Sequence, residues 1–160
     1  YVQSDPNFAN YLYDTETGVI GLIDFGAARP VPPDIAEAYR ALMTAGACGD
    51  LDGVRVQAHA LGFIDARTPE DRIARFVELS ALAMAPLGHD GAFDFGESDL
   101  GRALRDGGMA FRGDRDLFPV PPIAVLYMQR KFGGVFLLAS RLRARVRVAE
   151  LFAPYAASTR

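Results

Sequence analysis

Residues 2–29 read VQSDPNFANYLYDTETGVIGLIDFGAAR, and this stretch decides the fold. It places Asp5 five residues before Asn10. Two runs of strand length follow, at residues 10–13 and 19–23, and the connection DTETG between them ends in a glycine that can close a turn at little conformational cost. The stretch therefore predicts a loop followed by an antiparallel hairpin.

The hairpin is expected to bring three oxygen-bearing side chains together. Its turn closes at Gly18, and folding back returns Asp24, the first residue of an Asp-Phe-Gly triplet, to the side of Asn10. Magnesium requires hard oxygen ligands in near-octahedral geometry, which Asn10 and Asp24 can supply. Asp5 then lies where an attacking hydroxyl or water needs a proton acceptor. The pattern is typical of the catalytic and metal-binding half of a kinase-like phosphotransfer site.

A second Asp-Phe-Gly triplet occupies residues 94–96, so the triplet alone is a weak signal. No apolar strand precedes this copy, and no Asp-x4-Asn loop lies just upstream of it. We therefore interpret residues 94–96 as loop and assign the site to the first copy, where loop, hairpin and triplet follow in the right order. The alternative for the first copy is an ordinary hairpin with polar caps.

Composition limits the class of protein. The chain has 160 residues, half of them apolar, which fits one globular domain. A net charge of −3 and a pI near 5.3 argue against a general nucleic-acid binder, so no nucleic-acid partner is expected. The single cysteine, Cys48, excludes an internal disulfide, and the apolar run 132–140 is too short to span a bilayer. Because the chain opens on Tyr1 instead of a methionine, we expect a fragment of a longer protein.

The remainder of the chain predicts helices. Pro33 suits the first position of a helix, and Thr68 followed by Pro69 and two acidic residues is typical of an N-cap. Apolar spacing predicts helices over residues 34–45, from Asp50 or Asp52 to 62, from 69 to the proline at 86, over 98–106, from 123 to 146 and over 149–155. The expected fold class is mainly α with a short N-terminal β-hairpin.

The longest predicted helix carries a glycine pair and a basic run. Gly133 and Gly134 each cost about 1 kcal/mol against alanine inside a helix, and a close helix crossing is the expected compensation. The basic run consists of Arg141, Arg143, Arg145 and Arg147. It predicts a solvated helix end whose cations complement the helix dipole. A sharper hypothesis is that this basic C-terminal helix contacts anionic lipid headgroups at a membrane surface.

Both ends of the chain resemble one family. The stretch QSDPNFANYLYD followed by VIGLIDFGAAR looks like the QTDPNxxNxxxD and LLDFGATR signature of the UbiB/ADCK family, atypical protein-kinase-like proteins tied to coenzyme Q biosynthesis. The tail FPVPPIAVLYMQRKFGGVFLLASRLRARV is similar to the family's PPP, HRKxxGxFLL and KLxAR segments. The resemblance covers residues 1–30 and 118–150. The chain departs from the family pattern at Gln129, where the family has histidine, and at Ile123 and Ala124, where acidic residues are usual.

The resemblance implies the C-terminal lobe of a protein-kinase-like fold over residues 1–160, with the N-terminal nucleotide-binding lobe upstream and absent here. Asp5 matches the family's catalytic-loop aspartate. The family's magnesium ligands match Asn10 and Asp24, and Gly26 matches the glycine that permits the turn in the nucleotide-binding triplet. The implied cofactors are Mg²⁺ and ATP or ADP. This fragment alone is expected to be inactive.

The resemblance also implies a biological setting. It predicts an ATPase or atypical kinase that supports ubiquinone or other isoprenoid-lipid biosynthesis, with a lipid or quinone-precursor ligand and peripheral membrane association. The expected location is cytoplasmic in a bacterium and the mitochondrial matrix in a eukaryote. Two alternatives stay open. One is a small-molecule kinase like the aminoglycoside and choline phosphotransferases, which tend to place an acidic residue soon after the triplet, whereas residues 27–33 contain none. The other is a non-catalytic, nucleotide-gated scaffold, which would keep the same ligands.

Overall fold

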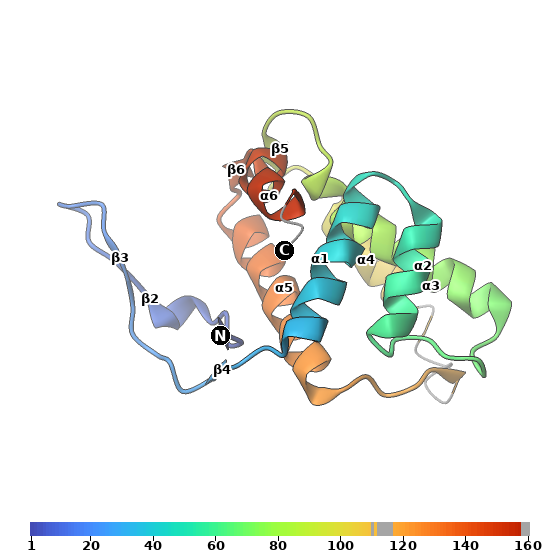
Figure 1. Ribbon diagram of the computed structural model, residues 1–160. Coiled ribbons are helices and arrows are strands. Elements are labelled where there is room, and N and C mark those ends of the chain that lie inside the picture. Colours follow the sequence, from blue (N-terminus) through green and yellow to red (C-terminus); the bar gives the residue numbers. More distant parts are fainter. Residues whose placement is uncertain (110, 112–116, 158–160) are drawn as a thin grey trace.

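Helices make up most of the computed structural model, which describes residues 1–109, 111 and 117–157. Within these residues the six α-helices are α1 (Pro33–Ala47), α2 (Leu51–Ala60), α3 (Glu70–Met84), α4 (Leu100–Met109), α5 (Ile123–Arg141) and α6 (Val148–Ala156). The single-turn 3-10 helices η1 (Phe8–Asn10) and η2 (Ala85–Leu87) also lie within the described residues. The helices gather into one body, and the β2–β3 hairpin projects from it (Figure 1). The predicted fold class, mainly α with a short N-terminal hairpin, is confirmed.

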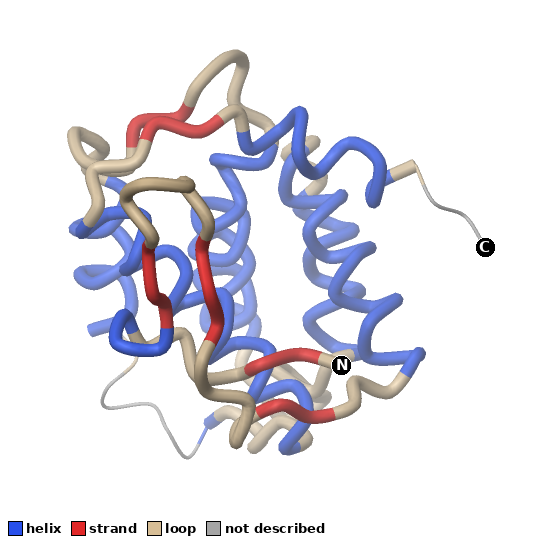
Figure 2. Tube along the Cα trace, turned by 90° about the vertical axis from the view of Figure 1, so that its left-hand side faces the viewer, coloured by secondary structure: helices blue, strands red, loops and turns tan. Residues whose placement is uncertain are grey.

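The part of the chain that the structure describes also contains three antiparallel strand pairs, which Figure 2 draws as separate pairs of red segments. The pairs are β1 (Val2–Gln3) with β4 (Ala28–Arg29), β2 (Tyr11–Tyr13) with β3 (Ile20–Leu22), and β5 (Phe93–Asp94) with β6 (Arg145–Val146). The β2–β3 hairpin has Tyr11 opposite Leu22. Gly18 takes a φ of 71°, as the turn signal predicts. The β1–β4 pair closes the base of the hairpin, so the whole segment from residue 2 to 29 folds back on itself.

The core lies between the first three helices and α5. Its buried members are Tyr39, Leu42, Val54, Ala58, Leu61, Phe63, Ile64, Ile73, Val77 and Val125. The Tyr39 hydroxyl donates a 2.9 Å hydrogen bond to the backbone oxygen of Val125, which fastens α1 to α5. Burial raises the pKa of Tyr39 because the phenolate would have to form away from water. The core thus holds α5 in a fixed place, and α5 in turn supports the N-terminal loop.

Helix starts agree with the sequence at two places and differ at a third. Pro33 is the first residue of α1, and Asp50 caps α2 by accepting the amide hydrogen of Gly53 at 2.9 Å. The prediction that Thr68 caps α3 is wrong, since the cap position is Pro69 and no side chain bonds there. The Thr68 hydroxyl is buried and instead accepts the amide hydrogen of Asp65 at 3.1 Å. The preceding turn therefore uses the hydroxyl that the helix was expected to use.

The longest helix ends earlier than its sequence predicts. It stops at Arg141 in a Schellman motif, in which the Ala144 amide bonds to the Ala139 oxygen (2.9 Å) and the Arg143 amide to the Ser140 oxygen (3.0 Å). Arg143 occupies the left-handed position, with a φ of 49°, where a glycine is usual. Strand β6 follows and pairs with β5, so Asp94 lies in a strand and the interpretation of the second triplet as loop is wrong for that residue.

Candidate functional site

The first part of the site is the contact between Asp5 and Asn10. The Asn10 side-chain amide donates to the backbone oxygen of Asp5 and to its carboxylate Oδ2, both at 3.3 Å. η1 forms the intervening turn, and Asn7 caps it by accepting the Ala9 amide hydrogen at 3.1 Å. Asn10 is only 7% exposed, so its orientation is fixed by its surroundings. The Asp-x4-Asn spacing brings the two side chains together, as the sequence predicts.

The triplet Asp24 to Gly26 forms the second part of the site. The Ile23 amide donates to the backbone oxygen of Asn10 at 3.1 Å, so the hairpin ladder delivers Asp24 immediately beyond the residue that faces Asn10. The Asp24 carboxylate is exposed, and its Oδ1 accepts the amide hydrogen of Gly26 at 2.8 Å. Gly26 thus fixes the aspartate through its backbone, and its own φ lies outside the left-handed region.

Gln3 joins the two parts. Its side-chain amide donates to the backbone oxygen of Asp5 at 2.7 Å and to that of Asp24 at 3.4 Å. Ser4, almost fully buried, donates from both its amide and its hydroxyl to the backbone oxygen of Ala27, at 3.1 and 3.0 Å. The chain on either side of the site is therefore held together by the two strands β1 and β4 and by these side chains. Both residues lie in the QSDPN motif, but nothing in the sequence pattern predicts these contacts.

Helix α5 supplies a contact that the sequence pattern did not predict. Arg130 Nη2 lies 2.8 Å from Asp5 Oδ1, an ion pair between residues 125 positions apart. Gly134, one turn further along the helix, lets Pro6 approach so closely that an added Cβ would lie 1.8 Å from Pro6 Cγ. The close approach expected at the glycine pair is real, but its partner is the loop and not another helix. A faint signal existed, because both residues lie in the tail that resembles HRKxxG.

The donor atoms of the site suit a hard divalent cation. Asp5 and Asp24 offer carboxylate oxygens, and Asn10 has an amide oxygen that its bond to Asp5 does not use. Within the described part of the chain no group of three or more His, Cys, Asp or Glu side chains could hold a metal ion. Magnesium usually keeps several waters and shares substrate phosphate oxygens. The residues therefore fit a cation bound jointly with a nucleotide, and not an all-protein metal cage.

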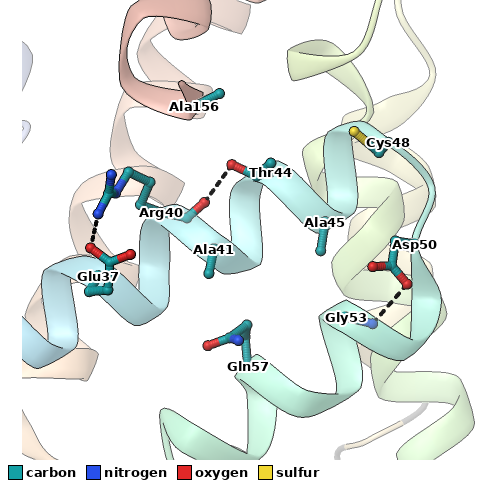
Figure 3. A pocket seen from close by; sticks show the side chains of 10 residues that line it. All are labelled: Glu37, Arg40, Ala41, Thr44, Ala45, Cys48, Asp50, Gly53, Gln57 and Ala156. Atoms are coloured by element: carbon teal, nitrogen blue, oxygen red, sulfur yellow. Dashed lines mark hydrogen bonds and ion pairs between the residues drawn. The ribbon is translucent and has the colours of Figure 1, made fainter. Parts of the chain in front are cut away.

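Two hollows on the surface lie away from this site. One, of about 380 Å³, opens between α1 and α2 near the end of α6 (Figure 3). Its lining residues are Glu37, Arg40, Ala41, Thr44, Ala45, Cys48, Asp50, Gly53, Gln57 and Ala156. Its charged groups are already used, since Glu37 pairs with Arg40 and Asp50 caps α2 (Figure 3). The other, of about 500 Å³, is lined by nine residues between Arg55 and Ile73, His59 among them. Neither of these two hollows contains a predicted site residue.

The basic run does not form the predicted basic C-terminal helix. Only Arg141 belongs to α5, and its guanidinium lies 5.6 Å from the centre of the Phe8 ring. The other three arginines pair with acids: Arg143 with Glu97, Arg145 with Asp94 at 3.4 Å, and Arg147 with Glu150 at 2.8 Å. The geometry on which the lipid hypothesis rested is therefore wrong, and membrane contact itself stays a prediction. None of the described helices has the length and apolar character needed to cross a bilayer.

The known proteins to which this chain is similar carry closely related names. No protein-family model matches the chain. The chain is 34% identical over 154 residues to "Atypical kinase COQ8, mitochondrial" of Saccharomyces cerevisiae, which covers 95% of this chain and 30% of the yeast protein. It is 30% identical over 152 residues to "Atypical kinase COQ8B, mitochondrial" of Rattus norvegicus, an alignment that covers 95% of this chain and 28% of the rat protein. It is 31% identical over 163 residues to the protein of that name from Danio rerio, which covers 95% of this chain and 24% of the fish protein. The similarity includes the middle helices, and the chain spans less than a third of each relative.

Proposed function

This chain is a relative of the UbiB/ADCK atypical kinases, as its two motifs predicted, and we propose that it is the C-terminal lobe of an ATP-dependent atypical kinase or ATPase. A kinase-like character follows from the relatives, which are named atypical kinases. The observation that carries the finer proposal is the side-chain contact of Asp5 with Asn10, with the backbone of Asp24 held next to that pair. The 3.3 Å contact joins Asp5 to Asn10, and the hairpin ladder and the Gln3 side chain hold the backbone at Asp24 to the same segment, which supports the proposal.

Each residue has a role that its contacts support. Asp5 orients the attacking hydroxyl or water and accepts its proton, because its carboxylate is held in place yet still 29% exposed. Asn10 and Asp24 hold magnesium through side-chain oxygens, and Gly26 steadies Asp24 through its amide. Magnesium, when bound, offsets negative charge on the phosphate oxygens. The hairpin also exposes apolar side chains, Leu12 and Ile23 among them, which suit contact with a nucleobase or another apolar covering surface.

The biological setting is also a proposal. By analogy with its COQ8 relatives, the full protein supports ubiquinone or a related isoprenoid-lipid biosynthesis, and takes a lipid or quinone-precursor ligand. Those relatives are named mitochondrial, so a eukaryotic source places this protein in the mitochondrion, in the matrix by our proposal. A bacterial source places it at the cytoplasmic face of a membrane. The similarity over 95% of the chain favours this reading over a small-molecule kinase.

The test compares the two Asp-Phe-Gly triplets in the full-length protein. Thermal unfolding is measured with and without magnesium and ADP, for the wild type, Asp24→Asn and the matched control Asp94→Asn. At about 100 times its dissociation constant a nucleotide stabilises the folded protein by about 2.7 kcal/mol. We expect a magnesium-dependent shift in the wild type and in Asp94→Asn, and its loss in Asp24→Asn.

Two other outcomes contradict the proposal. A wild-type protein with no magnesium-dependent shift has no nucleotide site of this kind. Equal losses in Asp24→Asn and Asp94→Asn would mean that the effect is not specific to the first triplet. A nucleotide shift without any phosphate transfer or hydrolysis, in a protein whose Asp5→Asn variant behaves identically, favours the non-catalytic scaffold.

A further inference from the structure

The carboxylate of Asp5 is held from two sides. Its Oδ2 accepts from the Asn10 side chain at 3.3 Å, and its Oδ1 accepts from Arg130 Nη2 at 2.8 Å. Rotation of an aspartate carboxylate about its last bond is soft, so donors on both oxygens are needed to fix its plane. The loop itself, DPNFAN at residues 5–10, contains no cation. The charge that faces Asp5 therefore comes from α5.

Helix α5 is shaped to receive this loop. Gly134 lies four residues after Arg130 and thus on the same face of the helix. A side chain there would overlap Pro6, which directly follows Asp5. The neighbouring Gly133 has nothing within 4 Å of an added Cβ. The glycine is thus required at 134 and not at 133, and it sets the distance between the loop and the helix at which Arg130 reaches Asp5.

We propose that Arg130 is a positioning residue for Asp5, and that α5 forms part of the reaction site by holding the carboxylate in the plane that the transfer step requires. This inference rests on the proposed function. Among the contacts of the described residues, Arg130 pairs with the proton acceptor and with neither proposed magnesium ligand, so we expect it to act on turnover and to leave nucleotide affinity unchanged. A general base misplaced by about 1 Å costs on the order of 100-fold in rate, which sets the scale of the expected effect.

The experiment measures turnover and nucleotide binding separately in the full-length protein. Arg130→Met removes the guanidinium and keeps an apolar stem, and we expect kcat to fall about 10- to 100-fold while the dissociation constant for magnesium-ADP changes by less than about twofold. Arg130→Lys keeps the charge without the planar fork and should recover only part of kcat. Lys131→Met, the adjacent cation of the same helix, is the matched control and should leave kcat unchanged.

A double-mutant cycle separates positioning from general support of the fold. If Arg130 acts through Asp5, then Arg130→Met causes no further loss of kcat in an Asp5→Asn background. A purely structural role gives the same loss in both backgrounds and lowers the melting temperature. Gly134→Ala should reproduce the kcat loss by displacing Pro6, whereas Gly133→Ala should not.

The outcomes distinguish a failure of the positioning role of Arg130 from a failure of the proposed nucleotide-dependent function. Unchanged kcat in Arg130→Met, or an equal loss on top of Asp5→Asn, overturns the positioning role while the nucleotide site stands. Magnesium-dependent nucleotide binding without any turnover in the wild type also overturns it. A wild type that binds no nucleotide overturns the proposed function and this inference together.

Discussion

The two Asp-Phe-Gly triplets have the same sequence and share one local hydrogen bond. Asp24 Oδ1 accepts the amide hydrogen of Gly26 at 2.8 Å, and Asp94 Oδ1 accepts that of Gly96 at 3.0 Å. An aspartate that bonds to the backbone two residues on is a common local turn, which the tripeptide can form in either place. The tripeptide accounts for this shared bond, while the next backbone bond differs: the Ala28 amide donates to the Phe25 oxygen at 2.9 Å in the first copy, and the Ser98 amide to the Asp94 oxygen at 3.1 Å in the second. The larger difference between the two copies lies in what surrounds them.

Those surroundings are opposite in kind. In the first copy Phe25 is 62% exposed, and Asp24 is exposed and directly follows Ile23, whose amide bonds to the backbone oxygen of Asn10. In the second copy the Phe95 ring packs against Phe93 at 4.9 Å and Phe136 at 5.7 Å, while Asp94 is strand-paired with Arg145. The first triplet is thus available to a ligand, and the second fastens the chain after α5 to the segment before α4. The comparison shows that the contacts around an Asp-Phe-Gly triplet, and not its sequence, decide whether it is exposed to a ligand or packed in the fold.

The largest stability difference is expected between the two phenylalanines. Phe95→Ala removes a half-buried ring with two aromatic neighbours and should lower the free energy of unfolding by about 2–3 kcal/mol, somewhat less than for a fully buried phenylalanine. Phe25→Ala should change it by less than about 0.5 kcal/mol, because that ring is largely exposed. Urea denaturation of the two variants measures both values. Equal losses would mean that the first triplet is also packed.

The glycines should differ by a smaller amount. A Cβ at Gly96 would lie 2.7 Å from Arg143 Cβ and 3.0 Å from its Cα, so Gly96→Ala should destabilise the protein by about 1–2 kcal/mol. A Cβ at Gly26 would meet only Asp24 Oδ1, at 3.1 Å. Gly26→Ala should therefore leave urea stability within about 0.5 kcal/mol of the wild type and weaken magnesium-nucleotide binding by displacing that carboxylate. A Gly96→Ala protein as stable as the wild type would contradict the packing described for the second triplet.

The hairpin and most helix starts could be predicted because their signals are local. The glycine turn at residue 18, the proline at 33 and the aspartate at 50 each act within a few residues of their own position. The strand pair β5–β6 could not be predicted in this way. Each strand has two residues, too few for alternation to show, and the partners Phe93 and Val146 lie 53 positions apart. The turn that precedes β6 also uses Arg143 where the sequence signal would be a glycine.

The candidate site also has a local part that the sequence could predict and a long-range part that it could not. Asp5, Asn10 and Asp24 lie within twenty residues, so the loop and the hairpin alone bring them together, and the sequence could predict it. Their chemical roles remain predictions until ligand binding is measured. The contact of Arg130 with Asp5 crosses 125 positions and depends on how the core seats α5, which no local pattern encodes. Only the similarity of the tail to a known motif indicated that this part of the helix mattered.

The smallest expected effect concerns the two aspartates themselves. Asp94→Asn keeps an oxygen for the turn but loses the 3.4 Å ion pair with Arg145, whose side chain is 73% exposed. An exposed pair of this kind contributes about 0.5 kcal/mol at low salt, and salt near 0.5 M should screen most of it. Asp24 makes no ion pair that the structure of the described residues shows, so Asp24→Asn should be as stable as the wild type at both salt concentrations. Urea denaturation at low and high salt, with the nucleotide assay on the same samples, measures both properties of each variant.

We expect opposite outcomes for the two variants, which we call the crossed result. Asp24→Asn loses nucleotide binding and keeps its free energy of unfolding, whereas Asp94→Asn keeps nucleotide binding and loses a salt-sensitive part of its free energy of unfolding. If Asp24→Asn is also destabilised, its loss of binding could arise from a disturbed hairpin, and only the crossed result separates a ligand-binding aspartate from a structural one.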